Sequence, residues 1–181
     1  MEWDTSLLCS GIAHIMYNLT GETILTFQGP ATHRPTALSD AEEPVLYKTY
    51  VEKEPMVHFL AEHFNCSLRE TRLYHRLLMS IIAEKCGNNV SRMHTQLLCK
   101  GGCLSISTIK HGLFSSLIYA ALFIEPHPEY QIHGLKSLGI SSVKDFSISV
   151  SQAYIQEVKA LSQENVPKPK IMTPFVNPPQ R

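Results

Sequence analysis

The chain of 181 residues has the length of one ordinary globular domain, and 44% of its residues are hydrophobic. Its 16 basic and 16 acidic side chains balance, which excludes a global field that would drive unspecific binding to nucleic acids or anionic membranes. Five cysteines without the spacing of a disulfide scaffold, and the lack of a cleavable signal peptide, predict an intracellular protein, cytoplasmic or nuclear. Export by a route without a cleaved signal would give the same pattern.

The first third of the chain gives mixed signals. Apolar residues recur at helical spacing after Asp4, which predicts a first helix that ends at Gly21. Residues 23–27 favour a short strand, and residues 45–51 fit a helix or a strand equally well, so the sequence leaves both segments open. Between them, glycine and prolines predict a long loop over residues 28–44.

The middle of the chain carries the clearest helix signals. Ser67 and Glu70 form a capping box, and the amphipathic run that follows has no glycine or proline until Gly87, which predicts a helix over residues 67–86. Proline at position 55 indicates the start of a preceding helix, which should stop near Asn65. A further helix is expected over residues 91–99.

Residues 104–125 include a stretch that is apolar on every side of a helix. No charge occurs from Gly112 to Ile124, and Pro126 forbids continuation. Thirteen residues rise about 20 Å as a helix, short of the roughly 30 Å needed to span a bilayer. We therefore expect a buried central helix over about residues 107–125, and no membrane insertion.

The last third is expected to contain a short helical piece near residues 130–138 and a longer helix over residues 141–163. The resulting fold class is mainly α: a single helical bundle-like domain of about six helices over residues 3–164, around the central helix. Five prolines in the final fifteen residues predict an extended tail over residues 165–181.

The segment Leu60–Leu78, LAEHFNCSLRETRLYHRLL, resembles the helix-turn-helix of many DNA-binding regulators. The resemblance rests on a turn at Asn65, a second helix that starts at Ser67, and two leucines that would pack inward. It implies that one face of the second helix contacts duplex DNA through Arg69, Arg72, His75 and Arg76. A capped amphipathic helix with a solvated arginine face explains the same residues.

Cysteine and histidine offer a weak metal hypothesis. Cys99 and Cys103 form one C-x3-C pair, but no second pair completes the usual zinc spacing, so no metal site and no cofactor is favoured. The ligands to test are Cys86, Cys99, Cys103 and His111. No catalytic motif is present in the sequence, and no catalytic residue is assigned; the chain is more consistent with a non-enzyme.

The tail contains apolar side chains that could dock on a partner, namely Ile171, Met172, Phe175 and Val176. An ordinary frayed terminus is the alternative. From the sequence we expect a non-catalytic interaction or adaptor module whose partner is another protein. The alternative is a helix-turn-helix transcriptional regulator that binds duplex DNA through residues 55–78, and the third hypothesis is a cysteine-dependent or zinc-containing enzyme. The oligomeric state does not follow from the sequence.

Overall fold

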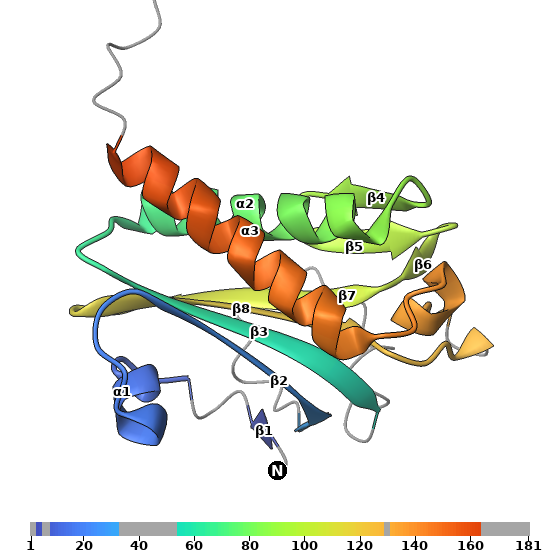
Figure 1. The fold of residues 1–181 in the computed structure, drawn as a ribbon, viewed down its shortest axis with the longest axis horizontal. Coiled ribbons are helices and arrows are strands. Elements are labelled where there is room, and N and C mark those ends of the chain that lie inside the picture. Colours follow the sequence, from blue (N-terminus) through green and yellow to red (C-terminus); the bar gives the residue numbers. More distant parts are fainter. Residues whose placement is uncertain (1–2, 5–7, 33–53, 129–130, 164–181) are drawn as a thin grey trace, which may run out of the picture.

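The structure is a computed structural model, and it describes residues 3–4, 8–32, 54–128 and 131–163 (Figure 1). These residues form a mixed α/β fold with two sheets. The elements in chain order are β1 (Trp3–Asp4), α1 (Ile12–Tyr17), β2 (Thr23–Thr32), β3 (Pro55–Phe64), α2 (Leu68–Cys86), β4 (Val90–Met93), β5 (Gln96–Cys99), β6 (Gly102–Cys103), β7 (Ser105–His111), β8 (Ser115–Phe123), the short 3-10 helix η6 (Leu135–Leu138) and α3 (Val143–Gln163).

The larger sheet has the strand order β1-β2-β3-β8-β7. β1 and β2 are parallel, and the other neighbours in this sheet are antiparallel. β3 and β8 lie at the centre, where Leu60 pairs with Tyr119. On the other side of β3, His58 pairs with Phe27 of β2. Residues far apart in the sequence therefore meet on one face of the sheet.

Helices α2 and α3 cover one face of this sheet, which we call the helix face (Figure 1). Alternate side chains of β3 and β8, such as Phe59 and Ala120, pack there against α2 and α3. The opposite face, which we call the second face, has an apolar cluster of its own. In this cluster Leu8 and Ile12 of the N-terminal segment pack with residues of β3 and β8 such as Leu60. The central strands are thus buried on both sides.

The smaller sheet, with strand order β4-β5-β6, follows α2. Side-chain hydrogen bonds tie it to β7: the Leu97 amide donates to Ser105 Oγ at 3.0 Å, and the Ser107 hydroxyl donates to the Thr95 carbonyl at 2.7 Å. This link fixes the start of the edge strand β7, which begins directly after β6.

Two long helices agree with the sequence. The capping box is formed, because Ser67 Oγ accepts from the Glu70 amide at 3.2 Å and the Glu70 carboxylate accepts from the Ser67 amide at 2.7 Å. The helix predicted over residues 67–86 is α2, and the one predicted over residues 141–163 is α3. The short strand suggested at residues 23–27 is also present, as the first half of β2.

The mainly α fold class is wrong. The expected central helix over residues 107–125 is the β7–β8 hairpin, and every residue of β8 is buried. A strand covered on both faces is apolar at every position, and so is a fully buried helix, so hydrophobic periodicity cannot distinguish the two. The described residues contain two sheets and three α-helices in place of a bundle of about six helices.

Further elements differ from the sequence prediction for related reasons. The helix expected over residues 55–65 is β3, and the one expected over residues 91–99 is the β4–β5 hairpin. The helix near residues 130–138 is reduced to η6, and the first helix to α1. The proposed loop over residues 28–44 starts too early, since β2 continues to Thr32.

Residues 45–51 and the tail over residues 165–181 lie outside the described residues. The described part of the chain has no helix of the length and apolar character needed to cross a membrane.

Candidate functional site

Polar side chains interrupt the apolar second face of the larger sheet at its centre. Because side chains alternate along a strand, β3 presents His58 and Glu62 on this face, and β8 presents Tyr119 beside them. Burial is nearly complete, since His58 is 0% exposed and Glu62 is 1% exposed. Buried polar groups need partners, so their hydrogen bonds define what the site can do.

His58 is clamped between two oxygen atoms. Its Nε2 lies 2.9 Å from the Gly29 carbonyl oxygen, and its Nδ1 lies 2.9 Å from the Tyr119 hydroxyl. A carbonyl only accepts, so Nε2–H donates to Gly29, and Nδ1 then accepts from the Tyr119 hydroxyl. Burial raises the pKa of Tyr119, which keeps the proton on this hydroxyl.

The imidazole of His58 stays neutral near pH 7. Burial lowers its pKa from 6.5 to about 4, and the hydrogen bond to Gly29 offsets only part of that effect. Phe27 stacks on the ring with a centroid distance of 4.7 Å and an interplanar angle of 13°. His58 can therefore position neighbouring groups, but it supplies no positive charge at neutral pH.

Glu62 joins three segments at one carboxylate oxygen. Its Oε1 accepts from the Gly11 amide at 2.6 Å and from the Ser115 hydroxyl at 2.5 Å. Nearby, the Lys110 ammonium donates to the Leu8 carbonyl at 2.5 Å. These bonds hold the N-terminal segment against the second face, and they place an exposed ammonium at the edge strand β7.

A second polar cluster lies on the helix face, where His63 is buried. Its Nε2 lies 2.8 Å from the Tyr154 hydroxyl, its Nδ1 lies 3.3 Å from Glu22 Oε1, and its ring stacks on Tyr74 at 4.4 Å. Burial lowers the pKa of His63, and Glu22 opposes this shift. Burial raises the pKa of Tyr154, so its hydroxyl donates to Nε2 and Nδ1–H faces Glu22. The cluster connects β3, α2 and α3.

The four residues assigned to DNA contact do not share one surface. Arg69, Arg72 and Arg76 are exposed on α2, but His75 is only 5% exposed and faces the core. Its Nε2 has no hydrogen-bond partner among the described residues, and burial followed by the charge of Arg76 lowers its pKa to about 4. The element before α2 is a strand, so no helix-turn-helix is formed.

The cysteines proposed as metal ligands are not gathered with other ligand side chains in the described part of the chain. Among the described residues, no group of three or more histidine, cysteine or acidic side chains could hold a metal ion. Cys103 donates to the Ser105 carbonyl, and His111 Nδ1 lies 2.7 Å from Ser116 Oγ. Burial and the neighbouring Cys99 raise the pKa of Cys86 to about 12.

The residues of the second face do not follow from the sequence prediction. His58 and Glu62 are four positions apart, a spacing that places them on one face of a helix as well as on one face of a strand, and Pro55 before them favours a helix. Lys110 and Tyr119 fall within the predicted central helix, which does not exist.

The fold is similar to that of a biotin protein ligase. The biotin protein ligase from Aquifex aeolicus, in complex with biotin and ATP, superimposes with a TM-score of 0.56 at 14% identity, over 88% of this chain and 68% of that chain. A mutant of the same ligase, in complex with biotin, gives a TM-score of 0.53 at 11% identity, over 74% of this chain and 61% of that chain. The chain thus spans about two thirds of these ligases.

A protein of unknown function from Pyrococcus horikoshi is similar over its whole length, with a TM-score of 0.78 at 21% identity, over 98% of this chain and 94% of that chain. The chain belongs to the family described as "Domain of unknown function (DUF366)", which matches residues 1–168. No curated protein matches the sequence.

These findings correct the function inferred from sequence. The solved structures that share the fold include ligases, so the adaptor module is wrong, and the helix-turn-helix regulator fails because β3 replaces its first helix. The cysteine-dependent or zinc-containing enzyme has no support in the geometry of the described cysteines. The partner-binding residues assigned to the tail, Ile171, Met172, Phe175 and Val176, lie outside the described residues.

Proposed function

We propose that this protein binds a small organic carboxylic acid at the second face of its larger sheet and activates the acid with ATP. In this reaction a carboxylate oxygen attacks the α-phosphorus of ATP, an acyl adenylate forms, and pyrophosphate leaves. The fold shared with a ligase that was determined with biotin and ATP supports the reaction class.

One observation within the chain carries the proposal: an exposed ammonium lies at the edge of a buried apolar cluster that contains a few fixed polar groups. Lys110 uses one N–H to bind the Leu8 carbonyl, and an ammonium has three donors, so two remain for carboxylate or phosphate oxygens. His58 is neutral at pH 7, so Lys110 is the cation that stabilises the negative charge that develops during adenylation.

The surrounding side chains suit the rest of such a substrate. Leu60, Leu117 and Phe123 belong to the apolar cluster of the second face, and each is at most 1% exposed because Leu8 and Ile12 pack in the same cluster. They would contact a hydrocarbon portion once the N-terminal segment moves away from this face. Both ring nitrogens of His58 are already hydrogen-bonded, so within this pair the Tyr119 oxygen, which still has acceptor capacity, is the atom that would orient a polar group. Apolar walls with a small number of placed polar groups are typical of small-molecule sites.

The test is exchange of radiolabelled pyrophosphate into ATP in the presence of single carboxylic acids, beginning with biotin, lipoate and octanoate. Exchange that depends on one of these acids supports the proposal. Replacing Lys110 by alanine should lower that exchange by about 100-fold, the effect of losing one donor to a developing oxyanion. Lys144→Ala, which changes an exposed lysine on α3, should leave it unchanged.

Thermal unfolding of both variants distinguishes a chemical role of Lys110 from loss of its bond to Leu8. If calorimetry shows no binding of ATP and no acid supports exchange, the proposed activity is refuted.

A further inference from the structure

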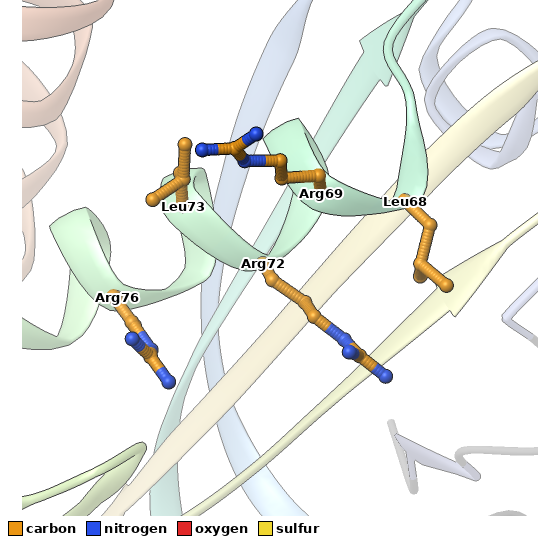
Figure 2. A pocket seen from close by; sticks show the side chains of 5 residues that line it. All are labelled: Leu68, Arg69, Arg72, Leu73 and Arg76. Carbon is orange, nitrogen blue, oxygen red and sulfur yellow. The ribbon is translucent and has the colours of Figure 1, made fainter.

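The outer side of α2 presents a surface that the proposed activity does not use. Three arginines and two leucines line a hollow there, namely Arg69, Arg72, Arg76, Leu68 and Leu73. Figure 2 shows Arg72 and Arg76 extending to one side of the helix, and Arg69 lying with Leu73 on the other. Both leucines are exposed, Leu68 by 42% and Leu73 by 56%. We call these five residues the arginine surface.

The three guanidinium groups are not neutralised within the described residues, where they make no hydrogen bond or ion pair. Glu70 is the acidic residue nearest to them in sequence, but its carboxylate already accepts from the Ser67 amide and hydroxyl at 2.7 Å each. These bonds lower the pKa of Glu70 and hold its charge at the N-terminus of α2. The chain as a whole is electrically balanced, so the arginine surface is a local excess of positive charge.

The spacing of the arginines favours a carboxylate-bearing helix as the occupant. Positions 69, 72 and 76 follow helical steps of three and four and span about 10 Å along the axis. Each guanidinium can bind a carboxylate through two parallel N–H donors. The exposed leucines beside them, Leu68 and Leu73, gain free energy only against apolar side chains, which an acidic amphipathic helix has and a phosphate backbone lacks.

We propose that the arginine surface is the docking site for an acidic amphipathic helix of a partner protein. The surface lies on the helix side of the sheet, whereas His58, Glu62 and Lys110 lie on the second face. The partner therefore does not compete with the substrate of the proposed ligase reaction. A negative result for the ligase reaction would not affect the docking proposal.

The experiment measures fluorescence anisotropy of a fluorescein-labelled helical peptide that has glutamates at helical steps of three and four with leucines between them. We expect saturable binding that weakens as salt is raised, because the pairs are partly exposed. Arg72→Glu should weaken binding by about tenfold or more, since it removes a bidentate pair and adds repulsion. Lys144→Glu is the matched control, because it reverses one exposed positive charge on α3, and it should change binding by less than about twofold.

Two further arms decide what kind of ligand the surface takes. Arg72→Lys keeps the charge but loses the planar pair of donors, so it should bind the peptide less tightly than the native protein and more tightly than Arg72→Glu. A second peptide with the leucines replaced by serine should bind more weakly. The proposal is overturned if the glutamate peptide does not bind at low salt, if Arg72→Glu binds as the native protein does, or if inorganic polyphosphate competes as well as the leucine-containing peptide does.

Discussion

Replacing the buried His75 by leucine should change how stability depends on pH. The pKa of His75 is about 4 in the folded protein and 6.5 as its ordinary value. Between these values the unfolded chain binds a proton that the folded protein does not bind, so the free energy of unfolding falls as the pH falls. At pH 7 the lowered pKa of the histidine changes the free energy of unfolding by almost nothing. At pH 5 it lowers the free energy of unfolding by about 2 kcal/mol.

Leucine removes this cost and also removes an Nε2 atom without a hydrogen-bond partner among the described residues. We therefore expect His75→Leu to be at least as stable as the native protein at pH 7, and to gain a further advantage of about 2 kcal/mol at pH 5. His58 has the same lowered pKa and should cause a parallel loss in both proteins.

Urea unfolding followed by circular dichroism at several pH values between 7 and 5 measures this difference. Substitution of the exposed His14 by glutamine serves as the control for removal of an imidazole from the surface. Parallel curves for the native protein and His75→Leu would refute the reasoning, because they would mean that His75 takes up its proton equally in both states.

Three further substitutions or labelling experiments test the packing. Tyr119→Phe leaves the Nδ1 of its histidine partner buried without a donor, so we expect a loss of about 1–3 kcal/mol in urea unfolding. The Cys86 thiol, with a pKa of about 12, should react with a disulfide reagent at pH 8 about 1000-fold more slowly than an unperturbed thiol, and the exposed Cys9 should react first. Gly134→Ala places a Cβ 2.4 Å from the backbone carbon of Glu125, so the backbone must shift, and the melting temperature should fall by several degrees.

Local signals in the sequence were sufficient to predict the two long amphipathic helices. Ser67 and Glu70 mark the start of α2 in the sequence and bond to each other in the structure, and α3 follows from its apolar stripe. Both helices have one exposed side, so the hydrophobic period of 3.6 is visible.

The strands could not be recognised in the same way. β3 and β8 are buried on both faces, and their apolar runs fit a buried helix as well as a strand. The second face depends on these strands, because its polar groups come together only when β3 pairs with β8 in the observed register. The spacing of His58 and Glu62 was available in the sequence, but their neighbour Tyr119 could be found only from the pairing.

The position of β3 and β8 at the centre of the sheet has a consequence during synthesis. Glu62 and Ser115, which are hydrogen-bonded partners in the folded protein, are 53 positions apart in the chain. When β3 has left the ribosome it can pair with β2, but its other edge has no partner until β8 emerges. In that interval the nascent chain exposes the unpaired edge of β3, a strand that is mostly apolar. An exposed edge on an apolar strand promotes aggregation. Helix α2 is formed by local contacts before β8 is made, so the helix against which β7 and β8 pack is already present when they emerge. Substitutions that weaken its capping box should therefore lower the soluble yield of the protein more than they lower its stability once folded.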